Sequence, residues 1–151
     1  MTPDQVTEEG DRLYAAALEA FGEDGWEMHR QWFACNASGG VNGVSLHLDS
    51  RFAQTLPAEP QKLAEQVQIA WSNSGVNAEI TVNRDLDPVR YILSDPPFLS
   101  GVNDDGSITD LWVGRGVANF GYVSPCVPGD IFELQPSQTS STPTVTPPSS
   151  P

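Results

Sequence analysis

Basic residues are scarce in this chain of 151 residues, and their scarcity narrows the range of partners. Seven Lys and Arg residues stand against 20 Asp and Glu residues, which gives a formal net charge of −13 at pH 7. A surface of this charge repels nucleic-acid phosphates and anionic lipid headgroups, so we expect no nucleic-acid partner. The chain also lacks any run close to the roughly 20 apolar residues that a membrane-spanning helix needs, so we expect no transmembrane segment.

The motifs of several enzyme classes are missing as well. The sequence contains neither the G-x-S-x-G pattern of hydrolases nor the H-E-x-x-H pattern of zinc proteases. The Gly-rich segment 39–43 has the spacing of neither a dinucleotide fingerprint nor a phosphate loop, and a strand-like segment follows it. The acidic segment 103–106 lacks the ligand pattern of a calcium loop. We interpret both segments as turns, and we expect no catalytic residue, no cofactor and no metal site.

Only two cysteines are present, and their positions are informative. Cys35 ends the first strand-like segment, and Cys126 follows the last one. Two cysteines that bracket a sheet-like region predict one disulfide, and a disulfide implies an oxidising compartment. The linkage closes a loop of about 90 residues. The rival role for Cys35, a catalytic nucleophile, would need a base such as His29, which lies about 20 Å away along the strand.

The two ends of the chain bear on its compartment. The start, Met1-Thr2-Pro3-Asp4, is polar and acidic, and it shows no signal peptide. If the disulfide forms, a signal peptide has been removed and Met1 is not the native start; if Met1 is native, the protein is cytosolic with free thiols. Because the C-terminal tail favours the first alternative, we predict a secreted or envelope-attached protein whose native signal peptide is absent from this chain.

The C-terminal tail, residues 135–151, consists almost entirely of Pro, Ser, Thr and Gln. It buries too little apolar surface to offset the entropy lost on ordering, so we predict that it is disordered. It is either a flexible spacer or simply a solvated terminus. The preceding residues, 1–134, are predicted to form a single domain.

The hydrophobic pattern of that domain predicts two helices and about six strands. Thr2, Pro3 and Gln5 form a start signal for a helix over residues 3–21, and a second apolar stripe predicts a helix over 60–74. Alternating patterns predict strands at 26–35, 44–49, 78–82, 89–93, 108–113 and 117–123. The order α-β-β-α-β-β-β-β with short strand connections predicts an α+β fold in two layers, in which an antiparallel sheet carries both helices on one face.

Four residues of the first hairpin are candidates for ligand binding. Arg30 interrupts the apolar row Trp26, Met28, Trp32, Ala34. A guanidinium near Trp32 is able to bind a carboxylate ligand, but it can also pair with a neighbouring acid. His29 and His47 can face each other across the hairpin, although no third zinc ligand is apparent. Surface or packing roles are the alternative for both histidines.

Three segments carry a resemblance to a known class of proteins. They are Trp32-Phe33-Ala34-Cys35, the end of the second helix at Trp71-Ser72-Asn73-Ser74-Gly75, and Val123-Ser124-Pro125-Cys126-Val127-Pro128-Gly129. With the arrangement of elements over residues 11–129, the chain resembles small actinobacterial cell-envelope lipoproteins of unknown function. The resemblance implies an α+β envelope domain with one disulfide. The chain departs from that class in its tail and in lacking the N-terminal cysteine that carries a lipid, so a lipid anchor would belong to the native precursor.

The leading hypothesis is a non-enzymatic binding or interaction domain for a protein or small-molecule ligand. The alternative in a different class is a hydrolase or transferase whose site is built from His29, His47 and Asp49. The third alternative is a structural spacer module that carries the tail.

Overall fold

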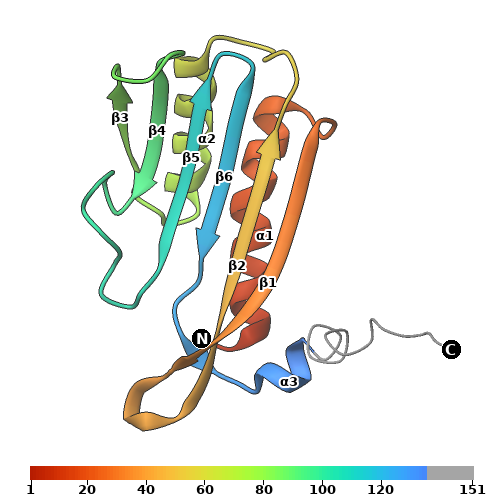
Figure 1. Cartoon of the computed structure of the whole chain (residues 1–151), viewed down its shortest axis with the longest axis vertical. Coiled ribbons are helices and arrows are strands. Elements are labelled where there is room, and N and C mark those ends of the chain that lie inside the picture. Colours follow the sequence, from red (N-terminus) through yellow and green to blue (C-terminus); the bar gives the residue numbers. More distant parts are fainter. Residues whose placement is uncertain (136–151) are drawn as a thin grey trace, which may run out of the picture.

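An antiparallel sheet with both long helices on one face forms the domain in the computed structural model, which describes residues 1–135 (Figure 1). The predicted α+β class and two-layer arrangement are thereby confirmed. In chain order the elements are α1 (Pro3–Phe21), β1 (Trp26–Asn36), η1 (Ser38–Gly40), β2 (Asn42–Phe52), α2 (Pro60–Asn73), β3 (Glu79–Asn83), β4 (Arg90–Asp95), β5 (Ile108–Gly114), β6 (Val117–Val123), β7 (Val127–Pro128) and α3 (Ile131–Leu134). Apart from Gln135, the predicted disordered tail lies outside the described residues.

The start of α1 follows the predicted capping box. The backbone N–H of Gln5 donates to the Thr2 hydroxyl at 3.2 Å, and the backbone N–H of Thr2 donates to the Gln5 side-chain oxygen at 2.8 Å. These two bonds satisfy amide groups that have no partner within the helix. The helix ends at Gly22, whose φ of 99° is readily adopted by glycine and whose N–H donates to the carbonyl of Leu18.

The strands lie in the order β1-β2-β6-β5-β4-β3, and all paired strands are antiparallel. Four of the pairings, β1 with β2, β3 with β4, β4 with β5 and β5 with β6, join strands that are consecutive in the chain. The pairing of β2 with β6 is not local: it runs from His47 opposite Val123 to Phe52 opposite Ala118. The two-residue β7 pairs with the start of β2, so β2 is flanked along its length by β1 and by the last part of the chain.

The core lies between this sheet and the two long helices. Its buried residues include Trp32, Leu46, Val67 and Trp71, while Trp26 and Ile80 are partly buried and pack against the core. Trp71 of α2 is inaccessible to solvent, and its indole N–H donates to the carbonyl of Leu13 in α1 at 3.0 Å. The two helices therefore meet through a buried aromatic side chain as well as through the sheet.

The predicted disulfide joins Cys35 at the end of β1 to Cys126, just before β7, with Cα atoms 6.1 Å apart. Both strands flank β2 at Gly43, which is opposite Cys35 on one side and Pro128 on the other. A Cβ atom at Gly43 would lie 2.6 Å from the sulfur of Cys126. The disulfide therefore passes over β2 where that strand has no side chain.

Gly43→Ala is expected to lower the free energy of unfolding by about 1–3 kcal/mol, because the added methyl group overlaps a sulfur held by a covalent bond. Urea denaturation of the oxidised protein measures this change. The same substitution in a protein that lacks both cysteines is the control, and there the loss should be clearly smaller. An equal loss in both backgrounds would show that the disulfide sulfur is not the atom that the methyl group meets.

The outer edge of β1 is capped by Gln135. Its side-chain oxygen accepts the backbone N–H of Trp32 at 2.6 Å, and its side-chain nitrogen donates to the carbonyl of Trp32 at 3.2 Å. An amide side chain thus supplies both bonds that a neighbouring strand would make at that position. Gln135, which the sequence analysis assigns to the tail, therefore contacts the domain through its side chain.

Candidate binding site on the open face of the sheet

The helices cover one face of the sheet and leave the other without a helical layer (Figure 1). Side chains alternate between these faces along each strand. In β2 the alternation separates buried Leu46 and Leu48 from partly exposed His47 and exposed Asp49. We use the name open face for the surface that carries His47 and Asp49, as it extends over β1, β2, β6 and β5. It comprises Glu27, His29, Gln31 and Phe33 of β1, Ser45, His47, Asp49 and Arg51 of β2, Asn119, Gly121 and Val123 of β6, and Ile108, Asp110 and Trp112 of β5.

The open face is hollowed at Gly121, in the middle of β6. Gly121 is opposite Asp49 on one side and Asp110 on the other, so a residue without a side chain separates two aspartates. The resulting cavity has a volume of about 500 Å³. We call it the Gly121 hollow; its lining is His47, Leu48, Asp49, Ile108, Asp110, Trp112, Asn119, Gly121, Tyr122 and Val123. It therefore combines carboxylates, an amide, an imidazole and an indole in one concave surface.

Asp110 lies over the glycine itself. A Cβ atom at Gly121 would be 2.6 Å from Oδ1 of Asp110, so the carboxylate occupies the space that any other residue would fill. Burial raises the pKa of Asp110 to about 6; a side-chain hydrogen bond with Trp112 opposes this shift, and the charge of Asp49 adds to it. No basic group in the described residues forms an ion pair with Asp110 or Asp49.

The other side chains of the hollow are held by their neighbours. The amide nitrogen of Asn119 donates to Oδ1 of Asp49 at 3.0 Å. The ring of Trp112 meets Phe98 edge-on, with ring centres 5.3 Å apart and planes at 87°. The rings of Phe33 and His47 are 4.2 Å apart. Such contacts restrict rotamers before a ligand arrives, which lowers the entropy lost on binding.

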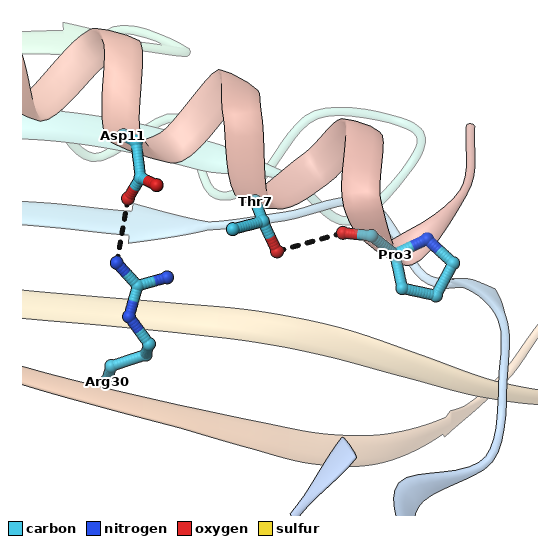
Figure 2. Close-up of polar contacts among 4 residues, drawn as sticks. All are labelled: Pro3, Thr7, Asp11 and Arg30. Atoms are coloured by element: carbon cyan, nitrogen blue, oxygen red, sulfur yellow. Dashed lines mark hydrogen bonds and ion pairs between the residues drawn. The ribbon is translucent and has the colours of Figure 1, made fainter. Parts of the chain in front are cut away.

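Two of the four predicted ligand-binding residues lie on the helix side of the sheet. Arg30 extends from β1 towards α1 and forms an ion pair with Asp11, with Nη2 2.7 Å from Oδ1 (Figure 2). In the same helix the hydroxyl of Thr7 donates to the carbonyl of Pro3 (Figure 2). Trp32 is 9% exposed and packs in the core. Arg30 thus makes the acid pairing that was the alternative to ligand binding, and neither Arg30 nor Trp32 lines the Gly121 hollow.

The two histidines do share the open face. His29 is directly opposite Asp49, and His47 lies two residues before Asp49 in β2. His29 is largely exposed and is 3.9 Å from Glu27, whereas burial lowers the pKa of His47. Within residues 1–135 no hydrogen bond links these histidines to each other or to Asp49. The same residues contain no group of three His, Cys, Asp or Glu side chains suited to hold a metal ion.

Sequence reasoning missed most of the hollow, including Asp110, Trp112, Asn119 and Gly121. Two signals for them were present. Asp110 and Trp112 alternate with Thr109, Leu111 and Val113 in β5, which separates them from the buried face. A glycine inside a strand indicates close approach of another group, here the Asp110 carboxylate. No local pattern in the sequence predicts the pairing of β6 with β2, which places Asp49 beside Gly121 on the side away from Asp110.

Asp110→Asn is expected to stabilise the protein at pH 7 by about 2 kcal/mol. The pKa of Asp110 is about 6 in the folded protein and near 3.8 in the unfolded chain, so the folded state binds this proton more tightly. The contribution of this proton to the free energy of unfolding is therefore fully present below about pH 4, and it is lost as the pH rises through about 6. Urea denaturation at several pH values measures the change; at pH 4 the variant and the native protein should differ little. An equal change at pH 4 and pH 7 would contradict the shift.

No helix within residues 1–135 is long and apolar enough to cross a membrane. The disulfide is compatible with an extracytoplasmic location. Comparisons of the chain with protein-family models, with curated proteins and with solved structures found no match.

Proposed function

We propose that this protein is a non-enzymatic binding domain that is secreted or displayed at a cell envelope and holds its ligand on the open face of the sheet. The observation that carries the proposal is the Gly121 hollow, where polar and aromatic side chains from three strands converge on a concave surface. Its volume of about 500 Å³ lies within the range of small-ligand sites, roughly 300–1,000 Å³. The disulfide between Cys35 and Cys126 supports the compartment, since disulfides persist in oxidising environments.

Binding is better supported than catalysis. Asn119 already donates to Asp49, and the described residues contain no hydrogen-bonded pair of nucleophile and base around the hollow. One observation favours a hydrolase or transferase as the second candidate: Asp110 has a pKa of about 6 beside a second carboxylate, which suits a general acid. This catalytic site would use Asp110 with Asp49 rather than the pair of histidines. Under the third alternative, a spacer, the hollow would have no ligand.

The proposal is tested by titrating the ¹⁵N-labelled protein with three probes of different charge: spermidine, N-acetylglucosamine and citrate. Binding on the open face predicts saturable shifts of backbone amides around Gly121, with amides of α1 and α2 unaffected, for at least one probe. Saturation of all shifts at one concentration identifies a single site. If none of the probes shifts these amides up to 10 mM or so, in the weak-binding range, the proposed location is wrong.

Gly121→Val is the matched variant for this test. The added side chain fills the hollow and displaces the Asp110 carboxylate, which lies where the new Cβ must go. We expect it to abolish the saturable shifts, because the cavity no longer exists. Thr81→Val, on β3 and separated from β5 by β4, places the same valine side chain outside the hollow by exchanging a hydroxyl for a methyl group, and it should leave binding unchanged. Equal loss in both variants would indicate a general effect on the sheet.

A further inference from the structure

We infer that the Gly121 hollow takes a small organic ligand through a primary ammonium group, held between Asp49 and Asp110 and against the Trp112 ring. This inference rests on the proposed function and specifies the ligand class of the same site. Its basis is the cavity together with the balance of charge inside it. Asp49 and Asp110 approach the cavity from β2 and β5, on opposite sides of Gly121.

The charge inside the hollow is uncompensated. The two ion pairs in the described residues are Arg30 with Asp11 and His29 with Glu27, and neither belongs to the hollow. His47 lines it, but burial lowers the pKa of His47, so its ring is neutral near pH 7. Arg51 is on the same face of β2, opposite Asn119, but it does not line the cavity.

Burying a carboxylate without a counter-charge is unfavourable, and a cation placed beside it relieves the penalty. Asp110 is in this situation, because it forms no ion pair within the described residues and its hydrogen bond with Trp112 comes from a neutral indole. A bound ammonium group would donate hydrogen bonds to carboxylate oxygens on two sides. An aromatic wall adds attraction for a cation, and an ammonium group close to the Trp112 ring would benefit from it. A carboxylate or phosphate ligand would meet two negative charges and is disfavoured by the same geometry.

Shape supports a small ligand. The Asp110 carboxylate, Trp112 and Asn119 stand around a floor formed by Gly121, and Phe98 packs against the edge of Trp112. The Asp110 carboxylate reaches this floor only because residue 121 is glycine. A chain of a few methylene groups next to the ammonium would lie along Ile108 and Val123, which supply the apolar part of the lining.

The test is isothermal titration calorimetry at pH 6 and about 0.15 M salt, where interactions between distant surface charges are screened. Nα-acetyl-lysine amide carries the ammonium group, and Nα,Nε-diacetyl-lysine amide is its uncharged counterpart. Spermidine is a second source of the same group. We expect the lysine derivative or spermidine to bind with a 1:1 stoichiometry and the diacetylated compound to bind at least tenfold more weakly. The tighter of the two ammonium probes then indicates whether a side chain or a free polyamine is the better ligand.

Asp110→Asn should weaken binding of the ammonium probe about tenfold or more, as expected for loss of a charged hydrogen-bond partner. Glu19→Gln removes the same charge from the exposed surface of α1 and should leave the affinity within twofold. Proton release gives a second readout. A cation stabilises the ionised form of Asp110, so binding at pH 6 should release a fraction of a proton, measured with buffers of different ionisation enthalpy. Asp110→Asn should abolish that release.

Four results would overturn the inference. Equal weakening by Asp110→Asn and Glu19→Gln would mean that the net charge of the protein attracts the probe without a site. Equal binding of the charged and diacetylated compounds would mean that the ammonium group is not recognised. Shifts around Gly121 with N-acetylglucosamine or citrate, but none with either amine, would reject the ammonium ligand while the proposed function stands. Absence of shifts with every probe would reject both.

Discussion

Trp71→Ala is expected to lower the free energy of unfolding by about 3–5 kcal/mol, the range for loss of a large buried aromatic side chain. Trp71 has no solvent-exposed surface, and it packs between α1 and the sheet, with its ring 6.2 Å from that of Phe120. The substitution removes these contacts, leaves a cavity, and deletes the indole donor to the carbonyl of Leu13. Urea denaturation followed by far-UV circular dichroism measures the loss.

Ile69→Ala is the matched control for Trp71→Ala. Ile69 lies two residues earlier in α2 and is 63% exposed, so its removal should change stability by less than about 0.5 kcal/mol. A loss below about 1 kcal/mol for Trp71→Ala would contradict the packing of α2 on the sheet. If the variant does not fold, Trp71→Phe, which retains most of the ring contacts, should fold with a smaller loss.

Removal of the disulfide by the double change Cys35→Ala and Cys126→Ala is expected to lower stability by roughly 4–5 kcal/mol at most. The bond closes a loop with a sequence separation of 91 residues, and the entropy of the unfolded chain rises when so long a loop is opened. The loop contains α2 and every strand from β2 to β6, so the whole sheet benefits from the constraint. Urea denaturation of the double variant beside the oxidised native protein measures the difference.

The redox state provides the control for this second prediction. The purified protein should have a mass about 2 Da below that of the fully reduced chain, because formation of the bond removes two hydrogen atoms. Reductant should lower the stability of the native protein to that of the double variant and leave the double variant unchanged. Free thiols in protein collected from outside the cell would contradict the bond and remove the argument from which we infer the compartment.

Local sequence patterns were sufficient to predict most of the helices and strands, because capping and alternation depend on residues that are close in the chain. Thr2 and Gln5 begin α1 as the capping box predicts, and Gly22 ends it. Alternation of apolar and polar residues located every long strand, since burial of one face of a sheet imposes a period of two. Pro60 opens α2 as expected, although the helix ends at Asn73, one residue before the predicted boundary. The four-residue α3 was not expected, because so short a helix has no periodic signal.

Local sequence patterns predicted only part of the candidate site. His47 and Asp49 were singled out, but Arg30 was placed among candidate ligands because its row of neighbours is apolar. In the structure Arg30 lies at an edge strand within reach of Asp11 in α1, a contact between residues 19 positions apart. The hairpin pattern contains no information about which acid in α1 lies above β1. The ion pair of Arg30 with Asp11 could therefore be predicted only from the way in which α1 packs on the sheet.

By itself, the sequence determined the two helices, the six main strands, the two-layer class and the identity of the disulfide partners, because spacing, capping residues and a cysteine count of two decide them. Tertiary structure alone decided the strand order. β6 pairs with β2 rather than remaining at the end of a meander, and this pairing joins residues about 70 positions apart. Such non-local pairing depends on the summed burial of whole faces rather than on any local signal. It is also what brings Asp49, Gly121 and Asp110 side by side and so creates the hollow.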